Sequence, residues 1–108
     1  MDTAATCQLE YSAFEPILYL AFELGVADWK LGFTIGPAQR PRVRAIRAGD
    51  LVALKAEINR AKKRFGLPEK AGVLSCYEAR RDGFWLHRYL KKQGVQNLVV
   101  DSSSVKVN

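Results

Sequence analysis

The sequence has few of the residues that usually build disulfide frameworks and zinc sites. Its 108 residues include two cysteines and one histidine. Cys7 and Cys76 are too few for a disulfide framework, and no Cys-x-x-Cys or Cys/His cluster predicts zinc. Cys76 lies in an apolar run, which predicts a buried side chain that packs as a small hydrophobe. His87 lies among aromatic residues on a predicted helix, where packing is its usual role. The residue pattern therefore excludes a disulfide-rich secreted domain and a zinc module.

Long apolar stretches and an amino-terminal positive charge are also missing. The longest apolar run, residues 17–22, is far shorter than the roughly 20 residues that cross a bilayer. No lysine or arginine precedes Lys30, so the amino terminus does not read as a secretory signal. We expect no membrane association and a cytoplasmic location.

The charge that is present is basic and unevenly placed. The net charge is +6, from 17 Lys and Arg against 11 Asp and Glu. Residues 40–64 hold nine bases and two acids, whereas residues 1–39 hold one base and five acids. A basic middle segment in an otherwise ordinary globular composition suggests a polyanionic partner, although a solvated surface would give the same pattern.

The hydrophobic pattern predicts five strands and two helices after an amino-terminal extension, residues 1–16, that ends at Pro16. The predicted strands are 17–24, 29–35, 42–47, 72–77 and 97–100, and the predicted helices are 51–65 and about 80–93. Asp50 is the expected N-cap of the first helix and Gly66 its C′ residue. Arg47 falls out of phase with Arg42 and Arg44, which predicts a bulge or strand end near Ile46.

This element order, βββαβαβ, predicts an α/β fold with a mixed sheet and helices packed on it. Two fold groups begin this way, the RNase H-like nucleases and the actin-like kinases and ATPases. Both place a catalytic acid on the first strand.

Two carboxylates are the candidate chemical residues. Glu23 interrupts an apolar strand, where a buried charge costs several kcal/mol unless it is compensated. Glu78 ends the fourth strand, which is the neighbour of the first strand in an RNase H-like sheet. Together they could hold a hard divalent cation for phosphodiester chemistry. The structural alternatives are an ion pair with an arginine for Glu23 and a helix-dipole contact for Glu78.

Three segments resemble the DEDD-type insertion-sequence transposases, which have a RuvC-like amino-terminal domain. The resemblance covers residues 17–108. It is carried by residues 18–25 with 29–33, by residues 76–90, and by residues 94–104. Its most specific part is Tyr-Glu-Ala-x-x-Asp-Gly-Phe-Trp-Leu at residues 77–86.

The resemblance implies a Mg²⁺-dependent enzyme of DNA transposition and recombination, with Glu23 as the first acid and Glu78 as the second. The first position is more commonly Asp in this family. The family pattern continues into a basic stretch with two further acids and a second domain with a catalytic serine, and this chain ends at Asn108. We therefore expect residues 17–108 to form a partial RuvC-like domain that is inactive alone. The resemblance also implies DNA as a partner, with a guide RNA and a homo-oligomer as further possibilities.

Several arginines are candidates for phosphate contacts that do not read base sequence. On a sheet edge they would equally deter aggregation. They are Arg40, Arg42, Arg44, Arg47, Arg80 and Arg81.

The sequence is also compatible with two alternative functions. One is a non-catalytic nucleic-acid-binding or interaction domain, which predicts salt-sensitive binding without cleavage. The other is an actin-like phosphotransferase, since Glu23-Leu-Gly25 faintly resembles the first phosphate loop of that group. The latter enzymes need a second domain that 108 residues cannot supply.

Overall fold

The computed structural model describes residues 16–36, 39–78 and 83–100. In chain order these residues form β1 (Ile17–Leu24), β2 (Asp28–Thr34), β3 (Arg42–Arg47), α2 (Leu51–Arg64), β4 (Gly72–Glu78), α3 (Gly83–Lys92) and β5 (Gln96–Val100). The predicted α/β class, the mixed sheet and the element order are confirmed. The predicted extension, residues 1–16, falls outside the described residues except for Pro16.

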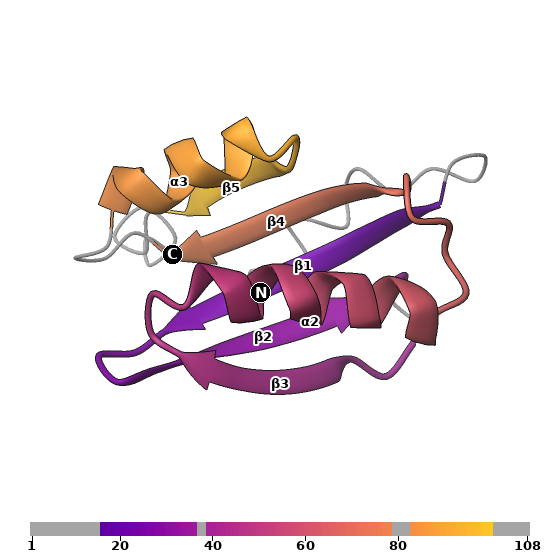
Figure 1. Cartoon of the computed structure of the whole chain (residues 1–108), viewed down its shortest axis with the longest axis horizontal. Helices are drawn as coiled ribbons and strands as arrows, with labels where there is room; N and C mark the ends of the chain where they lie inside the picture. The colour runs from indigo at the N-terminus through magenta and orange to yellow at the C-terminus, as the bar shows by residue number, and fades with distance from the viewer. Residues whose placement is uncertain (1–15, 37–38, 79–82, 101–108) are drawn as a thin grey trace, which may run out of the picture.

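The five strands form one mixed sheet in the spatial order β3-β2-β1-β4-β5, which differs from the order along the chain. β1, β2 and β3 form an antiparallel meander, and β4 and β5 are parallel to β1. The connections through α2 and α3 both lead toward the β5 edge. Because such crossovers share one hand, both helices pack on the same face of the sheet (Figure 1).

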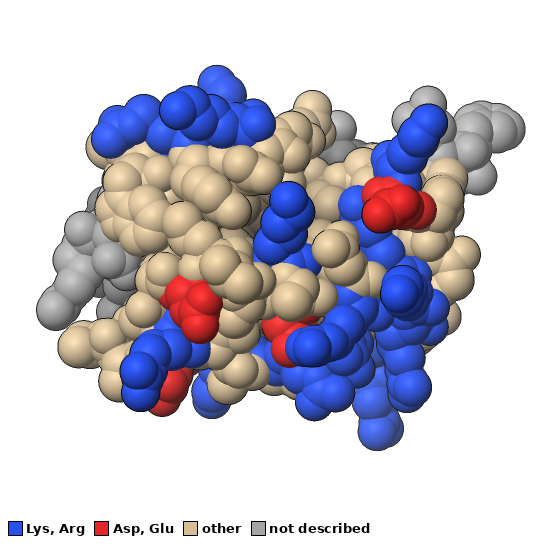
Figure 2. All heavy atoms as spheres, viewed as in Figure 1, with Lys and Arg blue, Asp and Glu red and all other residues tan. Residues whose placement is uncertain are grey.

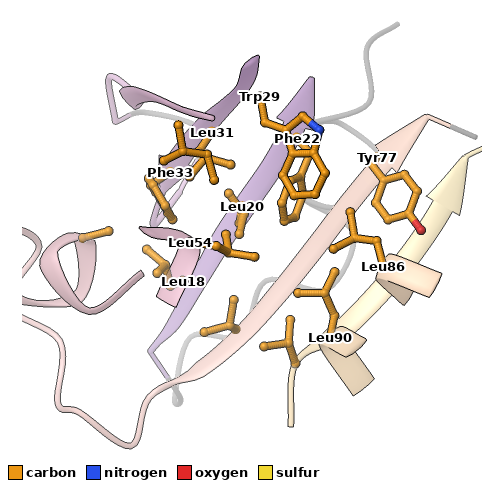
Figure 3. Close-up of a cluster of buried hydrophobic side chains, with 14 residues drawn as sticks. Leu18, Leu20, Phe22, Trp29, Leu31, Phe33, Leu54, Tyr77, Leu86 and Leu90 are labelled. Atoms are coloured by element: carbon orange, nitrogen blue, oxygen red, sulfur yellow. The ribbon is translucent and has the colours of Figure 1, made fainter. Parts of the chain in front are cut away.

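Side-chain alternation divides the sheet into two faces. We call the face that packs against the helices the helix face. It carries Leu18, Leu20 and Phe22 of β1 with Val73 and Tyr77 of β4. Toward the opposite face point Tyr19 and Ala21 of β1 with Leu74 and Cys76 of β4. The main core lies between the helix face and the apolar sides of α2 and α3, including Leu54, Leu86 and Leu90 (Figure 3).

Local sequence signals set the bounds of α2. The Asp50 side chain accepts a hydrogen bond from the Ala53 backbone N–H at 3.0 Å, as expected of an N-cap. Gly66 follows the helix with a φ of +71°, a conformation that favours glycine. Both predictions are confirmed.

Of the two features predicted near Ile46, the strand end is confirmed, because β3 ends at Arg47, and the bulge is wrong. Residues 42–47 pair with β2 in unbroken register, from Phe33↔Arg42 to Asp28↔Arg47. Arg47 lies out of phase with Arg42 and Arg44 because it points to the opposite face of a regular strand, where exposed charge is tolerated. Cys76 is completely buried, as expected, but it is disulfide-bonded and does not serve only as a small hydrophobe.

We expect Leu54→Ala to lower the free energy of unfolding by about 2–5 kcal/mol, because Leu54 is 1% exposed and its loss leaves a cavity between α2 and the sheet. The matched control is Val52→Ala on the same helix, where Val52 is 82% exposed and the change should stay within about 0.5 kcal/mol. Urea unfolding followed by circular dichroism measures both. Equal effects would contradict this packing.

Candidate metal and nucleic-acid sites

The two candidate acids stand side by side at the carboxyl ends of β1 and β4. These strands are parallel neighbours, with pairs from Ile17↔Gly72 to Phe22↔Tyr77. Continuing the register by one residue places Glu23 beside Glu78. Neighbouring strands lie about 4.8 Å apart, and alternation directs both side chains to the opposite face. The topology therefore brings together two carboxylates that are distant in the sequence.

Glu23 is exposed, so the expectation that it is buried and needs compensation is wrong. Most residues of the apolar run are buried, including Leu18, Leu20 and Phe22, but Glu23 is not. The physical reason is its position at the end of the strand, one residue before the turn to β2. Glu78 is half-buried. The exposed Glu23 carboxylate is accessible to a ligand from solvent.

Aromatic packing beneath the acids holds the ends of the strands. Phe22 and Tyr77, the residues just before the two acids, meet edge to face at a ring separation of 6.0 Å. Phe22 makes a similar edge contact with Trp29 of β2, also at 6.0 Å, and Trp85 of α3 lies 6.1 Å from Trp29. Such pairs add about 0.5–1.5 kcal/mol beyond burial. The two acids therefore directly follow packed aromatic residues of β1 and β4. Figure 3 shows Phe22, Trp29 and Tyr77 of this packing.

Positive side chains share the opposite face with the acids. Lys30 of β2 stands directly across from Glu23 in the antiparallel register, and Arg47 of β3 stands across from Asp28. Opposite charges in such positions are stabilising by roughly 0.2–1 kcal/mol. Within residues 16–36, 39–78 and 83–100, no group of three or more His, Cys, Asp or Glu is placed to hold a metal.

Gly25, which suggested a phosphate loop, has a local structural role. Its N–H donates to the Asp28 carbonyl at 3.0 Å in the β1–β2 turn. A Cβ at this position would lie 2.5 Å from that carbonyl oxygen. This close approach of the backbone accounts for a glycine at position 25, so a nucleotide-binding role is not needed to explain it.

The candidate arginines do not form one surface. Arg42 and Arg44 point to the helix face, because they are in register with the buried Phe33 and Leu31. Arg47 points to the opposite face, and Arg40 is exposed just before β3. Arg80 and Arg81 lie outside the described residues. The strand alternation thus separates arginines that are neighbours in the sequence.

Glu57 of α2 is the organising residue that sequence reasoning missed. Its carboxylate lies 2.8 Å from Arg60 Nη1 and 3.9 Å from both Arg42 Nη2 and Arg44 Nε. We call these four residues the α2 arginine cluster. Glu57 and Arg60 are one helical turn apart, which was visible in the sequence. Their proximity to β3 depended on how α2 packs.

A buried polar network joins β4, β5 and α3. The Ser75 hydroxyl donates to Asn97 Oδ1 at 2.7 Å, and Asn97 Nδ2 lies 2.9 Å from His87 Nδ1. Ser75 is fully buried and Asn97 is 9% exposed. His87, expected to pack, therefore also fixes α3 against β5 by hydrogen bonding. A lone serine, asparagine and histidine gave no sequence signal for this link.

None of the helices in the described ranges is long and apolar enough to cross a membrane.

Comparison with known proteins gives one informative relative. No protein-family model matches the chain. The chain is 28% identical over 91 residues to a Sinorhizobium fredii (strain NBRC 101917 / NGR234) protein named "Putative transposase y4rJ". The match covers 82% of this chain and 23% of that relative, so the chain spans about a quarter of its length. The chain is therefore similar to a transposase over most of its own length.

We expect Asn97→Ala to lower the free energy of unfolding by about 1–3 kcal/mol, because it leaves the buried Ser75 hydroxyl with a long 3.3 Å contact to the Gln96 carbonyl. Ser75→Ala combined with Asn97→Ala should cost less than the sum of the single changes, since both partners are then removed. A double-mutant cycle from urea unfolding measures this coupling. If the two single changes were strictly additive, the contact between Ser75 and Asn97 would contribute no coupling energy.

Proposed function

We propose that the chain is the RuvC-like, RNase H-like part of a DEDD-type DNA transposase. The observation that carries the proposal is the placement of Glu23 and Glu78 on one face, at adjacent ends of two parallel strands. The similarity to a transposase over 82% of the chain supports the same conclusion. Activity of the whole protein is part of the proposal, because the chain spans 23% of that relative.

The two carboxylates suit a magnesium ion. Mg²⁺ in proteins is commonly held by one or two carboxylates, with water and substrate phosphates completing its coordination. Glu23 and Glu78 supply two oxygen ligands on a rigid sheet end. When bound, such an ion polarises a phosphodiester for attack. The residues present therefore fit this metal, with further ligands coming from substrate, water or residues beyond the pair.

Nucleic acid would approach this site along the opposite face. Lys30 stands on that face in β2, the strand next to β1, and Arg47 stands on it in the edge strand β3. Arg40 is exposed just before β3. Phosphate contacts of this kind position a duplex without reading its bases. We therefore assign these residues to the phosphate backbone and the two acids to the metal.

A second candidate function is nucleic-acid binding without catalysis. It is favoured by the small number of acids, since no group of three metal-ligating residues occurs within the described ranges. This function requires the basic residues but no metal site at Glu23 and Glu78. Metal binding therefore separates the two candidates.

We expect the chain to bind Mn²⁺, a spectroscopic substitute for Mg²⁺, through Glu23 and Glu78. Glu23→Gln combined with Glu78→Gln should weaken Mn²⁺ affinity at least about tenfold, because neutral amides replace two charged ligands. Electron paramagnetic resonance of free Mn²⁺ during a titration measures the affinity.

Glu69→Gln is the matched control, because Glu69 is an exposed carboxylate in the loop before β4. It should leave Mn²⁺ affinity unchanged. Equal Mn²⁺ affinity in the native chain and the double variant would remove the metal site and leave the non-catalytic function.

We expect DNA affinity to fall steeply with salt. With about three phosphate contacts, binding of a short duplex should weaken about 40-fold between 50 and 200 mM salt, because the cations of the protein displace counterions condensed on the DNA. Fluorescence anisotropy of a labelled duplex measures this dependence. An affinity that does not change with salt would reject the proposed phosphate contacts.

A further inference from the structure

The basic residues of the helix face have no place in the site described above. The acids, Lys30 and Arg47 lie on the opposite face of the sheet. The α2 arginine cluster lies on the helix face, at the edge formed by β3 and α2. Figure 2, which views the helix face, shows lysine and arginine side chains gathered over α2 and the neighbouring edge of the sheet. A single duplex lying flat on one face would not contact both sets.

The α2 arginine cluster has more positive charge than its own structure uses. Three guanidinium groups surround the single carboxylate of Glu57, which leaves a formal excess of two positive charges. The Arg42 side chain is 18% exposed and belongs to the packing, whereas Arg44 and Arg60 are 50% and 63% exposed. Arg44 and Arg60 therefore present charge to solvent while each keeps one contact with Glu57.

Glu57 also prepares these arginines for binding. A free arginine side chain loses rotamer entropy when it is fixed. The Glu57 carboxylate is only 13% exposed, and it already restricts Arg60 through a 2.8 Å contact. Guanidinium groups can form two parallel hydrogen bonds with a phosphate. Glu57 is the sole acidic residue of α2, so no other acid of this helix balances the excess positive charge.

We propose that Arg44 and Arg60, positioned by Glu57, bind the phosphate backbone of a DNA segment on the α2 side of the sheet, separate from the DNA at the acid pair. This inference rests on the proposed function and extends it. The domain would then contact two DNA segments on its two faces, as an enzyme that joins separate DNA sites requires. Two further exposed cations, Lys63 and Arg64, follow Arg60 in the last turn of α2.

The principal test compares two variants that remove the same charge. We expect Arg44→Gln combined with Arg60→Gln to weaken binding of a short DNA duplex at least about tenfold. The slope of log affinity against log salt should fall by about 1.8, because two phosphate contacts are lost. The matched control is Lys91→Gln combined with Lys92→Gln, which removes two exposed charges from the end of α3. Equal losses in the two double variants would overturn the site.

Glu57→Gln tests the positioning role directly. It adds one unit of positive charge, so a purely electrostatic surface would bind DNA more tightly. A cluster that Glu57 positions should bind no more tightly than the native chain, and the gain in charge should not appear in the affinity. Tighter binding by this variant would reject the role of Glu57. Thermal unfolding of each variant verifies that the fold is retained.

Three further arms separate the possible partners and the two proposals. A duplex RNA of equal length, or polyglutamate of equal charge, should bind more weakly than DNA, and equal or tighter binding by either would overturn the assignment to DNA. In the absence of metal, the Arg44 and Arg60 changes should weaken DNA binding by the same factor in a chain that also carries Glu23→Gln and Glu78→Gln. If native DNA binding persists while those changes have no effect, this inference fails and the proposed function stands. If the native chain binds no DNA, both fail.

Discussion

The parallel pairing of β1 with β4 organises the whole sheet. It joins the amino-terminal meander to the two helical crossovers, so that one sheet can carry both helices on one face. The pairing also sets a register in which the residue after Phe22 stands beside the residue after Tyr77. Edge-to-face contacts among Phe22, Tyr77 and Trp29 hold that end of the sheet together. The position of the two acids is therefore a consequence of core packing on the other face of the same strands.

The division of the sheet into two faces gives the charge distribution a meaning that net charge alone lacks. A basic middle segment, read along the chain, looks like one continuous surface. In the folded protein its arginines alternate across β3, and α2 adds Arg60 and Glu57 to one side only. One face thus combines acids with Lys30 and Arg47, and the other holds arginines around a single carboxylate. This separation is the physical basis for assigning the two faces to different DNA segments.

The Ser75–Asn97–His87 network adds specificity at the β5 side of the sheet. Buried polar groups are costly unless each finds its partner, so the register of β5 and the docking of α3 are restricted together. Apolar packing of Leu86 and Leu90 is non-directional, so it positions α3 less specifically than hydrogen bonds do. The hydrogen bonds therefore complement a core that holds α3 mainly through its apolar side.

Short-range sequence patterns predicted the helices and strands, their order and their ends. Helical spacing from Leu51 to Phe65, the Asp50 cap and the Gly66 terminus depend on short-range interactions that can be recognised along the chain. Sequence alone misjudged the burial of Glu23 and the regularity of β3, because both depend on which face other elements cover. Tertiary packing makes Glu23 and Glu78 neighbours on one face and brings Arg44 and Arg60 together at Glu57 on the other. The reason is physical: alternation and helical period are local properties, but strand pairing and helix docking join residues far apart in the chain.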